Sequence, residues 1–143
     1  MAIGHMTTDE RNAFLADVRV GVLAVEEPGR GPLALPVWYF LDGDDVVVSM
    51  DGSSLKGRLL RAAGRATLTV QSEAPPYKYV SVEGPVEIGQ PRAGDDDFAL
   101  AARYLGPEFG RMYIDANPQT ADTVHVRLRP EHWRTFDFSK MLG

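Results

Sequence analysis

Short β-rich runs, separated by turn-forming residues, recur along most of this chain and limit what it can fold into. Asp42-Gly43-Asp44-Asp45 is typical of a tight turn between two runs, and Pro and Gly break the chain at 28–32 and 74–76. The runs do not alternate with long helices, as the strands of a parallel sheet would, so we expect a small antiparallel barrel. The six or seven expected strands cover 18–25, 33–41, 46–50, 66–70, 77–88, 123–128 and 133–138.

Residues typical of helix starts and ends occur in about three places outside these runs. One of these places is the basic segment described below. Thr7 or Thr8 is placed to cap a helix over 8–15, which carries acidic residues in its first turn. Another helix is expected over 95–105, because it begins with aspartates and is followed by Gly106-Pro107. The fold class is therefore mainly β with flanking helices (α+β).

The length and composition predict one domain without a membrane span. Of the 143 residues, we assign 7–143 to a single domain and interpret 1–6 as an expression scar. The chain has no cysteine and no apolar run of about 18 residues, so a soluble, cytoplasmic protein is expected. A net charge of -5 argues against a general nucleic-acid binder.

A cluster of cations stands out in this acidic chain. No Asp or Glu occurs between Gly52 and Ser72, and Ser53 and Ser54 can cap a short helix there. Backbone N–H groups, hydroxyls and cations would then converge on one anion, which predicts a phosphate site. The alternative interpretation is the solvated face of a helix. The four cations are Lys56, Arg58, Arg61 and Arg65.

Other polar residues are interpreted as structural. Consecutive carboxylates at 95–97 point in different directions on a helix and suit its N-terminus better than a metal site. His125 and His132 have no metal-binding spacing and no cysteine partner, so we expect no metal. The motifs of serine hydrolases, P-loop NTPases and Rossmann dehydrogenases do not occur in the sequence.

The order of the strands and the segment Ser54-Leu55-Lys56-Gly57-Arg58 resemble a known family, the pyridoxamine 5'-phosphate oxidase-like proteins. The similarity runs from about residue 10 to residue 138 and includes the run Arg65-Ala-Thr-Leu-Thr-Val70. It implies an antiparallel split β-barrel and a homodimer, with a flavin or deazaflavin in the groove between two barrels.

Within that family, the chain looks like the short actinobacterial branch that uses coenzyme F420, a deazaflavin. The pairing of Lys56 with Arg58 and the strand Tyr79-Val-Ser-Val-Glu-Gly84 are similar to that branch. The first strand, 19–25, lacks the paired basic ends that FMN-dependent members place there. The resemblance therefore favours F420, with FMN as the alternative cofactor.

The resemblance implies hydride transfer from the reduced deazaflavin to a small-molecule acceptor, an electron-poor C=C, quinone or imine. No acid–base dyad is required, and no catalytic residue is assigned. Two alternatives stay open: an FMN-dependent oxidoreductase and a non-catalytic carrier of a flavin, deazaflavin or haem. Substrate selectivity is expected in loops at 73–77 and 106–109.

By the same resemblance, ten residues are expected to hold the cofactor, in two groups. The phosphate-bearing arm would be bound by Lys56 and Arg58, with further hydrogen bonds from Ser49, Met50, Ser53 and Ser54. The ring system would be flanked by Pro36, Val37 and Trp38, and Tyr79 would lie near the cofactor from the facing strand.

Overall fold

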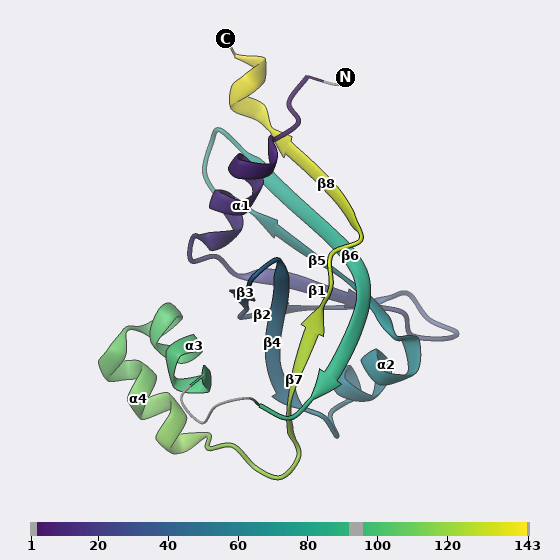
Figure 1. Cartoon of the computed structure of the whole chain (residues 1–143), viewed down its shortest axis with the longest axis vertical. Coiled ribbons are helices and arrows are strands. Elements are labelled where there is room, and N and C mark those ends of the chain that lie inside the picture. The colour runs from purple at the N-terminus through teal and green to yellow at the C-terminus, as the bar shows by residue number, and fades with distance from the viewer. Residues whose placement is uncertain (1–2, 92–95, 143) are drawn as a thin grey trace.

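The strands of this protein form one antiparallel sheet that is divided into two halves (Figure 1). The computed structural model describes residues 3–91 and 96–142, and every strand pairing in this part of the chain is antiparallel. This confirms the expected α+β split barrel. The strands are β1 (Gly21–Val25), β2 (Leu33–Val37), β3 (Phe40–Asp42), β4 (Asp45–Asp51), β5 (Arg65–Gln71), β6 (Lys78–Gly89), β7 (Thr123–Leu128) and β8 (His132–Asp137).

Four α-helices accompany the sheet in the part of the chain that the structure describes. None of the helices within 3–91 and 96–142 has the length and hydropathy that a membrane span requires. A short 3-10 helix, Phe138–Met141, follows β8. The α-helices are α1 (Thr8–Ala16), α2 (Leu55–Ala63), α3 (Asp96–Leu105) and α4 (Pro107–Ala116).

The two halves of the sheet share the long, curved strand β6 (Figure 1). Residues 78–85 of β6 pair with β5 and β8, whereas 86–89 pair with β7. The change of partner falls directly after Gly84-Pro85. An added Cβ at Gly84 would lie 1.9 Å from the backbone oxygen of Arg129, so this crossing requires glycine.

The core lies inside the barrel and is built from the inward-facing residues, which alternate with outward-facing ones along strands such as β1 and β5. Tyr39, Leu68 and Val80 are fully buried. The Tyr39 hydroxyl donates to the backbone oxygen of Leu15 at 2.7 Å, which fixes α1 against one side of the barrel. Burial is the main reason that the pKa of Tyr39 is raised to about 12.

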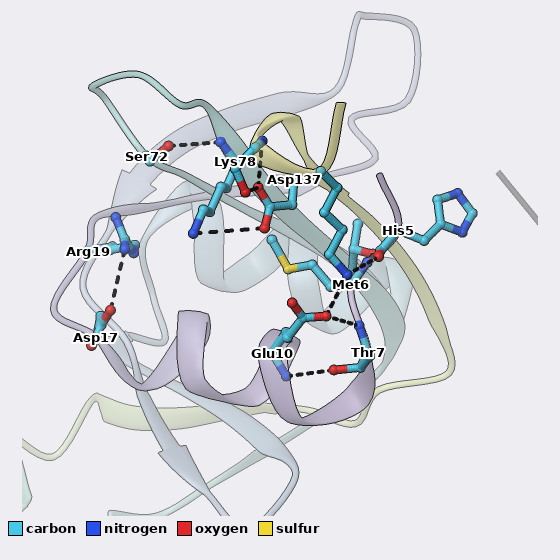
Figure 2. Close-up of polar contacts among 12 residues, drawn as sticks. His5, Met6, Thr7, Glu10, Asp17, Arg19, Ser72, Lys78 and Asp137 are labelled. Carbon is cyan, nitrogen blue, oxygen red and sulfur yellow. Dashed lines mark hydrogen bonds and ion pairs between the residues drawn. The ribbon is translucent and has the colours of Figure 1, made fainter. Parts of the chain in front are cut away.

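Helix α1 begins with the cap that the sequence predicts. The Thr7 hydroxyl accepts from the backbone N–H of Glu10, and the Glu10 carboxylate accepts from the backbone N–H of Thr7. Lys140 then donates to Glu10 at 2.6 Å and lowers the pKa of that carboxyl to about 2. These contacts join α1 to the C-terminal 3-10 helix (Figure 2).

The first described residues also contact β8. The Gly4 carbonyl accepts from the Asp137 N–H at 2.7 Å, and the Met6 N–H donates to Thr135. Gly4 and Met6 fall in the segment that we interpret as an expression scar; Met1 and Ala2 lie outside the described residues.

The run 33–41, expected as a single strand, is two strands, so the described residues contain eight strands rather than six or seven. β2 pairs with β1, whereas β3 pairs with β4 in the other half of the sheet. Between them lie Tyr39, which is fully buried in the core, and Trp38, whose ring stacks on Tyr104 of α3. The run 33–41 therefore passes from one half of the sheet to the other. Its composition alone does not predict this change.

Helix α4 was not expected, because Gly106-Pro107 was interpreted as the end of a helix followed by a loop. Gly106 does end α3, at a φ of +85°, but Pro107 is also the first residue of α4. Gly110 of α4 packs so closely on α3 that an added Cβ would lie 2.8 Å from the Cα of Ala102. The two helices form a hairpin that lies beside the barrel (Figure 1).

Candidate functional site

A cavity of about 720 Å³ lies between the barrel and the α3–α4 hairpin. Six of the ten residues expected at the cofactor site line it: Pro36, Val37, Trp38, Ser49, Met50 and Lys56. Sequence reasoning missed the hairpin side of the cavity, because a helix pair folding back over a barrel leaves no local pattern. The main hairpin residues in the lining are Asp97, Leu100, Ala101, Tyr113, Ile114 and Asn117.

Trp38 forms an aromatic wall of the cavity. Its ring stacks on Tyr104 of α3 with centroids 5.1 Å apart and planes within 6°. Tyr113 of α4 lies 5.2 Å from the Trp38 ring at a tilt of 52°. Trp38 is thus held between the barrel and the hairpin, in an arrangement that suits a flat apolar ligand.

The Tyr104 hydroxyl anchors this aromatic stack to the barrel. It donates to the backbone oxygen of Arg19 at 2.6 Å and accepts from the backbone N–H of Tyr39 at 3.1 Å. Both partners are backbone groups next to the cavity-lining residues Val20 and Trp38. Tyr104 therefore sets the position of α3 relative to the barrel.

Replacing Tyr104 by phenylalanine should lower the free energy of unfolding by about 1.5 kcal/mol, because two backbone groups lose their partner while the ring stack remains. Urea unfolding measures this loss. Tyr113→Phe is the matched control, since the Tyr113 hydroxyl makes no hydrogen bond within residues 3–91 and 96–142. Equal stabilities of the two variants would contradict the anchoring role of Tyr104.

Lys56 brings a positive charge to the other part of the cavity. It is half-buried, and burial lowers the pKa of its ammonium. Within residues 3–91 and 96–142, no carboxylate lies within 4 Å of its Nζ atom. A partly desolvated cation without a counter-ion is a site for an anionic group.

Three of the residues expected along the phosphate arm do not line this cavity: Ser53, Ser54 and Arg58. Ser54 caps α2, accepting from the backbone N–H of Gly57, as the sequence predicts for this pair of serines. Ser53 donates to the Asp51 carboxylate at 2.6 Å. Arg58 is exposed on α2, and Arg65 makes an ion pair with Glu131 at 2.8 Å. Of the four clustered cations, Lys56 is therefore the one that reaches the cavity.

Tyr79 lies elsewhere on the barrel. Its ring stacks on Phe136 with centroids 6.3 Å apart, and both line a second cavity of about 430 Å³ together with Trp133. Within one copy of the chain, Tyr79 therefore does not line the cavity that Trp38 lines.

Asp97 interacts with several polar side chains at the main cavity. Its carboxylate lies 2.8 Å from Nε2 of His125 and accepts from the Gln119 amide at 2.8 Å. The His125 hydrogen bond is the main reason that the Asp97 pKa is lowered, and hydrogen bonds from Gln119 and Ser49 act in the same direction. Asp97 thus remains a carboxylate at neutral pH.

The surroundings of Asp97 fit a structural role better than a metal site. In residues 3–91 and 96–142 no group of three or more His and acidic side chains is placed to hold a metal ion. Asp95 lies outside the described residues. The sequence interpretation treated His125 as structural but could not identify its partner, because Asp97 lies 28 residues away.

The fold and sequence agree with a known family. The family model described as pyridoxamine 5'-phosphate oxidase matches residues 7–137. No curated protein matches the chain.

Solved structures have the same architecture. A conserved hypothetical protein from Mycobacterium tuberculosis is 23% identical with a TM-score of 0.79, and the match covers 100% of this chain and 92% of that one. An F420 reductase is 25% identical with a TM-score of 0.68, over 86% of this chain and 94% of that one. A FAD-binding protein from Mesorhizobium loti is 20% identical with a TM-score of 0.66, over 94% of this chain and 97% of that one. The chain therefore belongs to the pyridoxamine 5'-phosphate oxidase-like family of flavin-binding oxidoreductases.

Proposed function

We propose that this protein transfers hydride from reduced coenzyme F420 to an electron-poor C=C, quinone or imine, with FMN as the alternative cofactor. The observation that carries the proposal is a cavity that joins the aromatic wall of Trp38 to the half-buried ammonium of Lys56, which pairs with no carboxylate within residues 3–91 and 96–142. Flavins and deazaflavins combine a flat ring with a phosphate-bearing arm. The ring matches the aromatic wall, and the phosphate matches the ammonium. The solved F420 reductase structure is a further reason to test F420 first.

The residues in the cavity suggest how each part of such a cofactor would be held. An apolar and aromatic surface for the ring is provided by Pro36, Val37 and Trp38. Ser49 and Met50 also line the cavity and would contact the arm of the cofactor. Lys56 would neutralise the phosphate. When bound, the reduced deazaflavin supplies the hydride; the protein positions the ring and excludes water from it.

Binding and turnover test this proposal in two steps. Isothermal titration with F420 and, separately, with FMN should give low-micromolar affinity for F420 and weaker binding of FMN. The reduced cofactor should then be consumed when a quinone or activated alkene is added. Tight binding without consumption by any acceptor class would instead indicate a carrier, and tight binding of FMN alone would support the FMN alternative.

We further propose that two copies of the chain associate along the strip of exposed apolar residues beside the cavity. Val20 is 48% exposed and Val22 41% exposed, and Val20 also belongs to the cavity lining. A second copy seated here would cover both the strip and the open side of the cavity. Sedimentation equilibrium should therefore give twice the mass of the chain; a monomer at micromolar concentration would contradict the proposal.

A further inference from the structure

The α3–α4 hairpin supplies one side of the cavity yet lies outside the barrel (Figure 1). The two helices pack closely on each other at Gly110. Their position relative to the barrel depends on side-chain contacts at the two ends of α3. Because Leu100 and Ala101 lie between those ends and line the cavity, the contacts also set the width of the cavity.

At the C-terminal end of α3, the contacts run to backbone groups. Arg103 donates to the carbonyl oxygens of Ala16 and Asp17 at 3.1 Å and 2.8 Å, where α1 ends. The Tyr104 hydroxyl reaches Arg19 and Tyr39, as described above. This end of the hairpin is held by several bonds to the main chain.

At the N-terminal end of α3, the connection depends on Asp97. His125 of β7 and Ser49 of β4 reach this carboxylate from the barrel, and Gln119 reaches it from the segment after α4. The side chains of His125 and Asp97 are only 9% and 11% exposed. Without His125, a nearly buried carboxylate would lose a strong partner, so the closed position of the hairpin would be destabilised.

We infer that the contact between His125 and Asp97 fixes the α3–α4 hairpin over the cavity, and that His125 is thereby a positioning residue for the ligand. His125 does not itself line the cavity, so it acts through Asp97, which does and which Ser49 and Gln119 also contact. The part of the inference that concerns the ligand rests on the proposed function. The part that concerns the hairpin does not.

Two substitutions at one position test the inference. His125→Leu removes the donor, whereas His125→Gln keeps an N–H donor in the side chain. Asp115→Asn is the matched control, because Asp115 pairs with Arg111 at 3.8 Å within α4, in an exposed ion pair that does not reach the barrel. Each variant is compared with the wild type by amide hydrogen exchange and by titration with F420 and FMN.

In His125→Leu, amides of 96–116 should exchange about tenfold faster while those of β5 keep their wild-type rates. The dissociation constant for the cofactor should rise about tenfold, equivalent to about 1.4 kcal/mol. His125→Gln should recover most of both effects, and Asp115→Asn should behave as wild type. Recovery in His125→Gln would show that the hydrogen-bond donor at position 125 matters, and not only the volume of its side chain.

Three results would overturn the inference: an unchanged hairpin exchange rate in His125→Leu, equal acceleration of β5, or an unchanged cofactor affinity despite a loosened hairpin. If the wild type binds neither F420 nor FMN, the proposed function fails together with the ligand part of the inference. The exchange rates then still decide whether His125 positions the hairpin.

Discussion

Replacing Gly84 by alanine should lower the free energy of unfolding by about 3 kcal/mol, a large loss for one methyl group. The added Cβ would lie 1.9 Å from the backbone oxygen of Arg129. That backbone cannot easily move away, because the Arg129 N–H donates to Pro85 and the Glu131 N–H donates to Glu83. The clash therefore falls where β6 changes partners, and relieving it would break the link between the two halves of the sheet.

Urea unfolding of Gly84→Ala measures this effect, and Gly89→Ala provides the control. Gly89 lies in the same strand, but an added Cβ there meets no atom within 4 Å. Its stability should change by no more than about 0.5 kcal/mol. Similar stabilities of the two variants would mean that the chain crossing at Gly84 is looser than the structure indicates.

Replacing Lys56 by alanine should weaken cofactor binding by about 1.5–3 kcal/mol, the range for a hydrogen bond to a charged group. The fold should be little affected, since no carboxylate within 3–91 and 96–142 pairs with the Lys56 ammonium and burial disfavours its charge. The free protein thus loses no stabilising ion pair. The complex loses the cation that would neutralise the phosphate.

Arg58→Ala distinguishes a specific contact from general attraction. Arg58 lies two positions along α2 and carries the same charge, but it is exposed and does not line the cavity. Titration calorimetry should show a much smaller loss of affinity for Arg58→Ala than for Lys56→Ala. Equal losses in both variants would indicate that the net charge of α2, rather than Lys56 in the cavity, attracts the cofactor.

The elements that were predicted correctly are those whose signals are local. The Thr7 cap, the Ser54 cap and the Asp-Gly turn before β4 all act within a few residues. The resemblance to the family implied the split form of the barrel, which local patterns alone do not determine.

The features that were missed depend on contacts between distant segments. The run 33–41 divides because its two parts pair in different halves of the sheet. Pro107 can begin a helix as well as follow one, and only the packing of Gly110 on α3 distinguishes the two outcomes. Among the clustered cations, their spacing alone could not show that Lys56 reaches the cavity and Arg58 does not.

The two tryptophans provide the most direct test of the central claim, that the cofactor binds between the barrel and the α3–α4 hairpin. Trp38 lines that cavity and Trp133 lines the second one, so their indole N–H signals in an NMR spectrum report on different sites. A Trp133→Phe variant assigns the two signals. Titration with F420 should shift the Trp38 signal and leave the Trp133 signal in place. A shift of Trp133 alone, with Trp38 unchanged, would contradict the account.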